Sequence, residues 1–164
     1  MNADPVRVYV AAGSNVDPRR RLRQALAGLE AQFGPLTVSP AYANTAVGFV
    51  GEDFVNLVFG FTTTRPVAEV LAGLHAVEAD CGRPRDAAKF GPRAMDLDLL
   101  LYGDQVGTVP GAVLPRPDLV KRPYMLGPLA DIAPTLVHPT LHRTIRELWA
   151  AFDHAGHELR PVTL

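Results

Sequence analysis

The amino-acid sequence predicts an α+β fold, namely a ferredoxin-like βαββαβ sandwich with C-terminal helical and edge-strand additions. Two kinds of observation predict it. Two segments with helical spacing of apolar residues alternate with short strand-like segments, in the order β-α-β-β-α-β. The chain has 164 residues, of which 48% are hydrophobic, and this size suits one domain with its own core. We therefore expect residues 1–164 to form a single domain.

The pattern begins with a strand followed by a helix. Valines occupy every second position over residues 6–10, a period of two that is typical of a strand, and Gly13-Ser14-Asn15 ends it. The apolar residues of 18–33 then fall near helical spacing, and Gly34-Pro35 marks the end of this predicted helix.

Two strands, a second helix and a fourth strand complete the pattern. Residues 36–45 and 54–63 are predicted strands, and the latter is rich in aromatic and β-branched side chains. A stripe of apolar residues predicts a helix over 66–81, which Pro66 can open and Gly82 can cap. Residues 95–102 form the last predicted strand.

The C-terminal third is expected to add helices to this core. A stretch rich in Pro and Gly follows Gly103, and a short helical segment is predicted over residues 125–132. A last amphipathic helix is predicted from the spacing of four apolar residues, Ile145, Leu148, Trp149 and Phe152.

Composition excludes several classes of protein. The 16 basic and 17 acidic residues give a formal net charge of −1, whereas nucleic-acid and membrane-surface binders usually carry a basic excess. No apolar stretch approaches the roughly 18 residues that indicate a membrane span. The N-terminus lacks the pattern of a signal peptide, and the lone Cys81 is consistent with a reducing compartment. We expect a cytoplasmic protein that binds neither nucleic acid nor membrane.

Residues 83–98 carry the pattern that points most directly to chemistry. Four cations occur in the predicted loop before the last strand, and Asp96 and Asp98 follow at a spacing of two. On a strand these two carboxylates project from one face, with Leu97 and Leu99 opposite. Mg²⁺ suits hard carboxylate oxygens and commonly leaves its other positions to water and phosphates.

A D-x-D pair alone, or a basic loop alone, is usually a solvated surface feature. Here the strand continues into the apolar residues 99–101 and is expected to be central in the sheet, where unpaired charge is costly. Guanidinium groups beside a pair of carboxylates suit a polyphosphate that carries Mg²⁺. The segment therefore predicts phosphoryl chemistry with ATP.

The segment Lys89-x-Gly91-Pro92-Arg93-x-x-Asp96-Leu97-Asp98-Leu99-Leu100 resembles the signature of the 6-hydroxymethyl-7,8-dihydropterin pyrophosphokinase family of folate biosynthesis. Nearly the whole chain shares the likeness. Further matching segments follow in order: Gly13-Ser14-Asn15, Phe54-x-Asn56, Glu78-x-x-x-Gly82-Arg83-x-Arg85, and Arg122-x-Tyr124-Met125-Leu126-x-Pro128-Leu129. The resemblance implies the same ferredoxin-like fold. It also implies transfer of pyrophosphate from ATP to the pterin hydroxymethyl group, giving the pterin diphosphate and AMP.

The resemblance implies a role for each matching residue. Catalysis would involve Arg83, Arg93, Asp96 and Asp98, and the two aspartates would hold two Mg²⁺ ions. ATP would contact His75, Glu78, Arg85, Lys89, Arg93, Leu99, Arg116 and Arg122. The pterin would contact Asn44, Thr45, Val47, Phe54, Asn56, Phe90 and Tyr124. The implied partners are the small molecules ATP and a reduced pterin, and a monomer is expected.

Some positions depart from the family pattern. The segment 42–48 stands where the family usually has Thr and Pro beside the pterin, and Arg116 stands where the family has a His. Two alternatives therefore stay open: a paralogue that uses the same ATP and Mg²⁺ site on a different alcohol, and a non-catalytic nucleotide-binding domain. The intact Arg83, Arg93 and aspartate pair argue against the second alternative.

Overall fold

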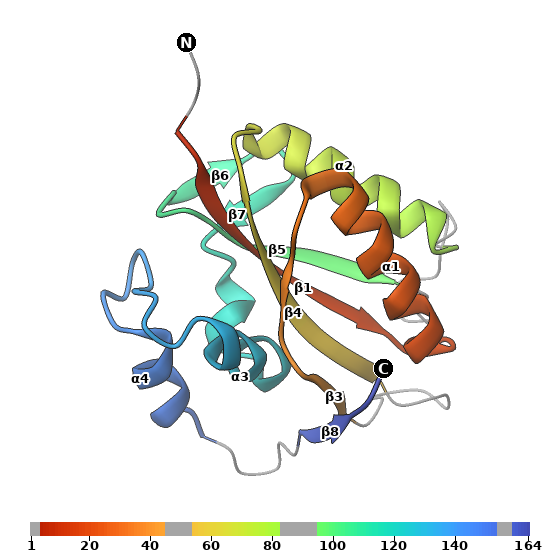
Figure 1. Cartoon of the computed structure of the whole chain (residues 1–164). Coiled ribbons are helices and arrows are strands. Elements are labelled where there is room, and N and C mark those ends of the chain that lie inside the picture. The colour runs from red at the N-terminus through yellow and green to blue at the C-terminus, as the bar shows by residue number, and fades with distance from the viewer. Residues whose placement is uncertain (1–3, 45–53, 83–94, 154–158) are drawn as a thin grey trace.

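The computed structural model describes residues 4–44, 54–82, 95–153 and 159–164. Its element order contains the predicted β-α-β-β-α-β arrangement, followed by additional C-terminal elements (Figure 1). The core elements are β1 (Val6–Ser14), α1 (Pro18–Phe33), β3 (Ala41–Asn44), β4 (Phe54–Thr63), α2 (Val67–Asp80) and β5 (Asp96–Tyr102).

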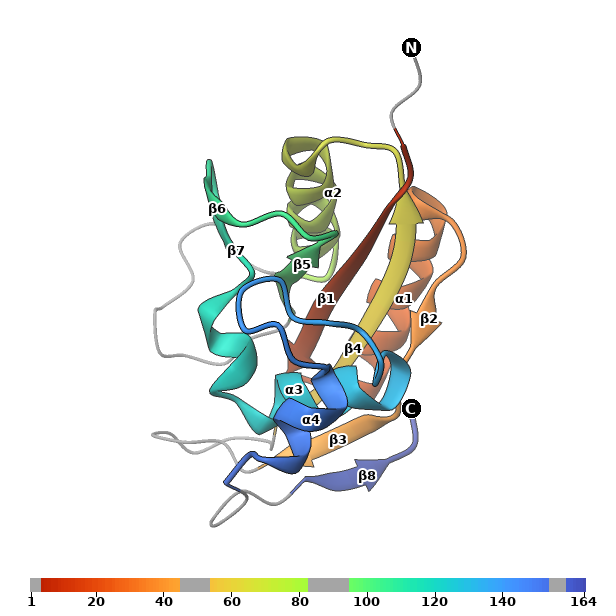
Figure 2. The ribbon, with the colours of Figure 1, turned by 90° about the vertical axis from the view of Figure 1, so that its left-hand side faces the viewer.

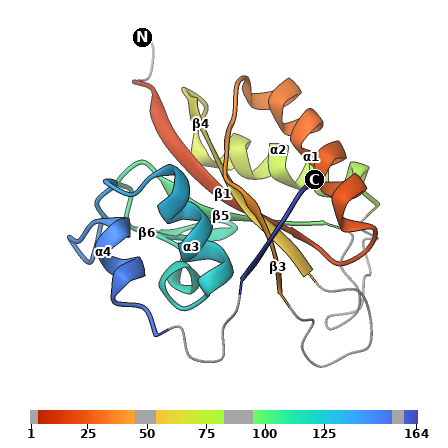
Figure 3. The ribbon, with the colours of Figure 1, turned by 60° about the horizontal axis from the view of Figure 1, so that its bottom comes forward.

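The core strands and the C-terminal strand β8 (Arg160–Val162) form one antiparallel sheet in the order β5-β1-β4-β3-β8, which confirms the predicted α+β fold. The first four are the four strands of a ferredoxin-like sheet in their usual order. The central strand β1 pairs with β4 on one side and with β5 on the other. Helices α1 and α2 cover one face of the sheet, and α3 (Pro123–Ile132) and α4 (Ile145–Ala150) lie over the other (Figure 3). The structure therefore has a hydrophobic core on each side of the sheet.

Helix α1 shows how local sequence and packing agree. It begins at Pro18, whose fixed φ suits a first helical position, and it ends before Gly34, which has a φ of 85°. Its buried side chains form one stripe against the sheet: Leu22, Ala25, Leu29 and Phe33. The ring of Phe33 stacks on that of Phe61 from β4, with centroids 4.4 Å apart. The apolar stripe thus fixes which face of α1 meets the sheet.

The strand predicted over residues 36–45 is divided in two. β2 (Thr37–Val38) and β3 both pair with β4, and Ser39-Pro40 lies between them. Ser39 bonds to β4 with its side chain as well as its backbone. Its backbone N–H donates to the Val58 carbonyl at 2.8 Å, and its Oγ accepts from the Val58 N–H at 2.9 Å. Pro40 has no N–H to donate, so the pairing is interrupted there.

The expectation that residues 95–102 form a central strand was wrong, because β5 lies at the edge of the sheet. Its leucines are buried because both faces are covered: Leu97 and Leu99 join the core under α1 and α2, whereas Leu100 and Leu101 join the other core. A register shift opposite Tyr9 and Val10 in β1 produces this change of face.

The C-terminal part adds the expected helices and an edge strand. α3 (Pro123–Ile132) and α4 (Ile145–Ala150) pack against each other, and β8 (Arg160–Val162) pairs with β3 (Figure 2). The hairpin of β6 (Gly107–Val109) and β7 (Ala112–Leu114) and the short 3-10 helix η1 (Pro117–Val120) lie in the stretch rich in Pro and Gly, where no element was predicted. Among the described residues, no helix combines the length and the apolar character needed to cross a bilayer.

The loop between α3 and α4 is built around the buried ring of His138. Its Nδ1 accepts hydrogen bonds from the backbone N–H groups of Thr140, at 3.3 Å, and Leu141, at 3.2 Å. An acceptor nitrogen requires an unprotonated Nδ1. Burial lowers the pKa of His138 below its usual 6.5, and the neighbouring His142 lowers it further. The native loop therefore selects neutral His138.

Because the pKa of His138 is lower in the folded state, its contribution to stability is present above about pH 6.5 and is lost as the pH falls towards the lowered value. Thermal unfolding from pH 7.5 to pH 5.0 should show a steeper fall in Tm for the wild type than for His138→Asn, whose amide oxygen can accept the same bonds without titrating. Equal slopes for the two proteins would contradict this role of His138.

Candidate active site

Two cavities meet at one residue of strand β5. The first, of about 480 Å³, lies between α2, β5 and the β6–β7 hairpin, and the second, of about 350 Å³, lies over the opposite face of the sheet, under the start of α3. Asp98 lines both cavities, and Asp96 lines the second. The carboxylate pair singled out in the sequence therefore stands where the two cavities adjoin.

Strand alternation gives the two carboxylates a common face. Leu97 and Leu99 turn into the core under α1 and α2, so Asp96 and Asp98 project the other way. Burial raises the pKa of Asp98, the Arg116 guanidinium lowers it, and the carboxylates of Asp96 and Glu78 raise it again. Asp98 thus has Arg116 as its cationic neighbour among the described residues, and the carboxylates beside it are groups of a kind that can bind a metal cation.

The donor set fits a hard divalent ion such as Mg²⁺. Asp96 and Asp98 offer carboxylate oxygens from one face of a strand. In the part of the chain that the structure describes, no cluster of three or more His, Cys, Asp or Glu residues could hold a metal. Two carboxylates cannot supply every ligand of a metal ion by themselves. They suit Mg²⁺, which commonly takes one or two carboxylates and completes its coordination shell with water and phosphates.

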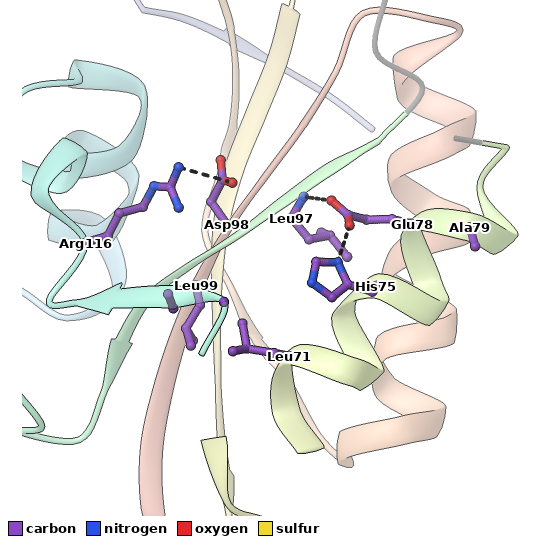
Figure 4. A pocket seen from close by; sticks show the side chains of 10 residues that line it. Leu71, His75, Glu78, Ala79, Leu97, Asp98, Leu99 and Arg116 are labelled. Atoms are coloured by element: carbon purple, nitrogen blue, oxygen red, sulfur yellow. Dashed lines mark hydrogen bonds and ion pairs between the residues drawn. The ribbon is translucent and has the colours of Figure 1, made fainter. Parts of the chain in front are cut away.

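Helix α2 forms one wall of the first cavity through His75 and Glu78 (Figure 4). Glu78 is 6% exposed, and its Oε2 accepts a hydrogen bond from the Leu97 N–H at 2.9 Å. Its Oε1 lies 3.0 Å from Nδ1 of His75, whose side chain is largely exposed. Glu78 therefore ties the start of β5 to α2, in addition to lining the cavity.

Arg116 lies across the first cavity from α2 (Figure 4). Its Nη2 is 3.5 Å from Oδ1 of Asp98 and 3.7 Å from Oδ2 of Asp118. The Arg116 backbone N–H donates to the Leu100 carbonyl at 2.9 Å, on the outer edge of β5. This bond brings a residue from the C-terminal part of the chain beside the carboxylate pair.

Small residues of β1 form the floor of the second cavity. Gly13 pairs with Asn56 of β4 on one side and with Asp96 of β5 on the other, so these three positions form one cross-strand row. A Cβ atom at Gly13 would lie 2.5 Å from Oδ1 of Asn56. Ala11, two residues earlier, also lines the cavity. The floor is therefore open because its side chains are small or absent.

Amides and aromatic rings surround this floor. Asn56 Nδ2 donates to Asn44 Oδ1, and Phe54 and Tyr124 also line the cavity. Burial raises the pKa of Tyr124, and the nearby Arg122 partly offsets this. The arrangement combines hydrogen-bonding amides with apolar rings, and it suits a flat polar heterocycle.

A hydrogen bond between the sheet and helix α3 holds α3 over the floor of the second cavity. Tyr42 of β3 donates from its hydroxyl to Oδ2 of Asp131 in α3 at 2.5 Å. Burial and this carboxylate raise the pKa of Tyr42 to about 12. The bond joins the strand that carries Asn44 to the helix that carries Tyr124.

The structure places all of the described candidate residues at the two cavities. The first is lined by His75, Glu78, Asp98, Leu99 and Arg116, and the second by Asn44, Phe54, Asn56, Asp96, Asp98, Arg122 and Tyr124. Seven other candidates lie outside the described residues: Thr45, Val47, Arg83, Arg85, Lys89, Phe90 and Arg93.

Sequence reasoning missed several residues that shape the cavities. They are Ala11, Ala12, Gly13 and Met125 in the second cavity, and Gly111 and Ala112 in the first. The run of small residues Ala11-Ala12-Gly13 in a predicted strand is the signal that could have indicated an open floor. Gly111 and Ala112 lie in the β6–β7 hairpin, which the sequence did not predict, so nothing in the sequence indicated that they line the first cavity.

Comparison with known proteins agrees with the family resemblance. The family model described as 7,8-dihydro-6-hydroxymethylpterin-pyrophosphokinase (HPPK) matches residues 9–134. The chain is 38% identical over 159 residues to the 2-amino-4-hydroxy-6-hydroxymethyldihydropteridine pyrophosphokinase of Pseudomonas aeruginosa, covering 94% of this chain and 97% of that protein. It is 34% identical over 142 residues to the enzyme of the same name from Aquifex aeolicus, covering 85% of this chain and 88% of that protein.

A solved structure supports the fold. The chain superposes with a TM-score of 0.70 on a crystal structure of Plasmodium falciparum HPPK-DHPS, at 14% sequence identity. The match covers 90% of this chain and 44% of the Plasmodium chain, so it concerns only one part of that longer protein. Together with the match to residues 9–134, these relatives show that the chain belongs to the 7,8-dihydro-6-hydroxymethylpterin-pyrophosphokinase family.

Proposed function

We propose that this protein transfers the pyrophosphoryl group of ATP to the hydroxymethyl oxygen of 6-hydroxymethyl-7,8-dihydropterin, giving the pterin diphosphate and AMP in folate biosynthesis. Pyrophosphoryl transfer is the activity of the family to which the chain belongs. The single observation that carries the proposal is that Asp98 lines two cavities of different character. Two substrates bound in these cavities would meet at the carboxylate pair.

We assign the first cavity to ATP. It is polar around His75, Glu78 and Arg116, and apolar at Leu71 and Leu99, as a purine nucleotide requires. Arg116 offers a guanidinium group for phosphate oxygens. Arg83, Arg85, Lys89 and Arg93 are further cations proposed for the polyphosphate, and their assignment stands on the signature sequence alone.

We assign the second cavity to the pterin. The amides of Asn44 and Asn56 can donate to and accept from the polar edge of the heterocycle, while the rings of Phe54 and Tyr124 can pack against its faces. Ala11 and Gly13 leave the floor of this cavity without large side chains. The same geometry favours a pterin over an unrelated alcohol, which was the main alternative.

The chemistry needs positioning and charge neutralisation, with no covalent enzyme intermediate. The hydroxymethyl oxygen forms a bond to the β-phosphorus, the bond from the β-phosphorus to the oxygen that joins it to the α-phosphate breaks, and AMP leaves as the hydroxyl proton is lost. Asp96 and Asp98 would hold Mg²⁺, proposed as two ions, and the metal would neutralise charge on the phosphates. The carboxylate-bound metal and the basic residues would thus neutralise the polyphosphate and align it with the hydroxymethyl oxygen.

The remaining assignments are expectations from the sequence. The proposed partners are ATP and the reduced pterin, with no nucleic acid, and the proposed state is a cytoplasmic monomer forming one domain. A non-catalytic nucleotide-binding domain is not favoured, because the relatives that match nearly full length are named as pyrophosphokinases.

The activity is tested directly by product analysis. Purified protein incubated with ATP, Mg²⁺ and 6-hydroxymethyl-7,8-dihydropterin should form AMP and the pterin diphosphate in equal amounts. Omission of the pterin should abolish AMP formation. AMP formation at the same rate with and without the pterin would refute the proposed acceptor.

The carboxylate pair is tested by substitution. Asp96→Asn and Asp98→Asn keep the side-chain shape but remove the charge, and each should lower kcat by about 10²–10³-fold, the usual effect of removing one group that stabilises a transition state. Steady-state rates at saturating substrates give the measurement, and Asp104→Asn on the same chain is the control. A variant of either residue with near-normal kcat would contradict its assigned role.

The floor of the second cavity is tested at Gly13. The new methyl group of Gly13→Ala would meet Asn56 Oδ1 and displace this amide, so KM for the pterin should rise by about tenfold while KM for ATP stays near normal. Gly34→Ala, at a glycine with nothing within 4 Å of the added Cβ, is a control remote from the site, although its φ of 85° makes a small loss of stability expected there. Equal effects on both KM values would count against a pterin in this cavity.

A further inference from the structure

The contact between Arg116 and Asp98 is an ion pair without close hydrogen-bond geometry. The 3.5 Å between Nη2 and Oδ1 exceeds the 2.7–3.2 Å typical of an N–H···O bond. Both side chains are about one-third exposed. Arg116 Nε is buried and makes no hydrogen bond within the described part of the chain. The guanidinium group is therefore held near Asp98 by charge more than by a fixed set of bonds.

The same guanidinium nitrogen has a second acceptor. Nη2 lies 3.7 Å from Asp118 Oδ2, almost as close as it lies to Asp98. The backbone around Arg116 is fixed, since its N–H donates to Leu100 and its carbonyl accepts from the Leu119 N–H at 3.1 Å. A fixed backbone with a shared guanidinium allows the side chain to change partner without movement of the chain.

The position of Asp98 makes such an exchange necessary. Among the described cations, Arg116 is the one that forms an ion pair with Asp98, at 3.5 Å. The oxygen that Arg116 approaches belongs to a residue assigned to Mg²⁺. A divalent cation and the guanidinium group would therefore compete for one carboxylate, since each neutralises the same charge.

We propose that Arg116 is a positioning residue that neutralises Asp98 in the absence of ligands and moves towards Asp118 and the nucleotide phosphates when the metal binds. This inference rests on the proposed function for the role of Asp98. It has two consequences. Divalent cations bind the nucleotide-free protein more weakly than the carboxylate pair alone would allow, and the nucleotide favours metal binding because it draws Arg116 away from Asp98.

The test measures Mn²⁺ binding to the full chain without nucleotide. Electron paramagnetic resonance gives the concentration of free Mn²⁺, and hence the amount bound, at each point of the titration. Arg116→Gln should bind Mn²⁺ about two- to fivefold more tightly than the wild type, as expected for loss of a partly exposed ion pair. Arg116→Lys keeps a positive charge and should bind more weakly than Arg116→Gln. In the presence of EDTA, Arg116→Gln should also bind ATP more weakly than the wild type.

Substitution of Asp118 distinguishes an exchange of Arg116 between two carboxylates from a general effect of its charge on Mn²⁺ affinity. Asp118→Asn should weaken Mn²⁺ binding, because Arg116 then keeps Asp98 as its main acceptor, and this weakening should shrink in the Arg116→Gln background. The control Arg143→Gln removes an exposed arginine that lies 4.0 Å from Glu147 and should leave Mn²⁺ affinity unchanged. Thermal unfolding of each variant verifies that it folds.

Several results would overturn the proposal. They are equal Mn²⁺ affinities for the wild type and Arg116→Gln, no detectable Mn²⁺ on either, equal effects of Asp118→Asn in both backgrounds, or a tightening by Arg143→Gln as large as that by Arg116→Gln. The assay for pterin-dependent AMP is independent of these measurements. Active protein with equal Mn²⁺ affinities would keep the proposed function and lose this inference.

Discussion

The pairing of β5 with β1 is the constraint on which the site depends. Side chains alternate along a strand, so a shift of β5 by one residue would bury Asp96 and Asp98 under the helices and turn Leu97 outward. The apolar core prevents this shift, because Leu97 and Leu99 are 6% and 3% exposed beneath α1 and α2. The hydrophobic effect on one face of the sheet thereby fixes the charges on the other.

Two hydrogen bonds from outside the sheet also hold β5 in place, because an edge strand leaves some backbone groups available to other segments. The carboxylate of Glu78 accepts from the Leu97 N–H, and the Leu100 carbonyl accepts from the Arg116 N–H. The first bond joins β5 to α2 and the second joins it to the segment after β7. Each contact also brings a side chain to the first cavity, so the groups that steady the strand are the groups that surround Asp98.

The second cavity depends on the small residues of β1. Val8 and Val10 of this strand fill the core under α1 and α2, whereas Ala11 and Gly13 leave a hollow over the other face. Helix α3 covers the hollow and is joined to β3 by the bond between Tyr42 and Asp131. The central strand thus supplies packing on one side and open space on the other. Because β5, β1 and β4 run side by side, that space lies between the carboxylates and Asn56.

The sequence by itself determined the order of the core elements, the bounds of α1 and β4, the common face of Asp96 and Asp98, and the family. These features depend on periodicity and on contiguous motifs, which are local properties of the chain. Only the tertiary structure decided that β5 lies at an edge, that Ser39-Pro40 divides a strand, that Gly13 faces Asn56, and that Arg116 reaches Asp98. Cross-strand register and the return path of the β6–β7 segment set these contacts, and both depend on residues far apart in sequence meeting through the shared core.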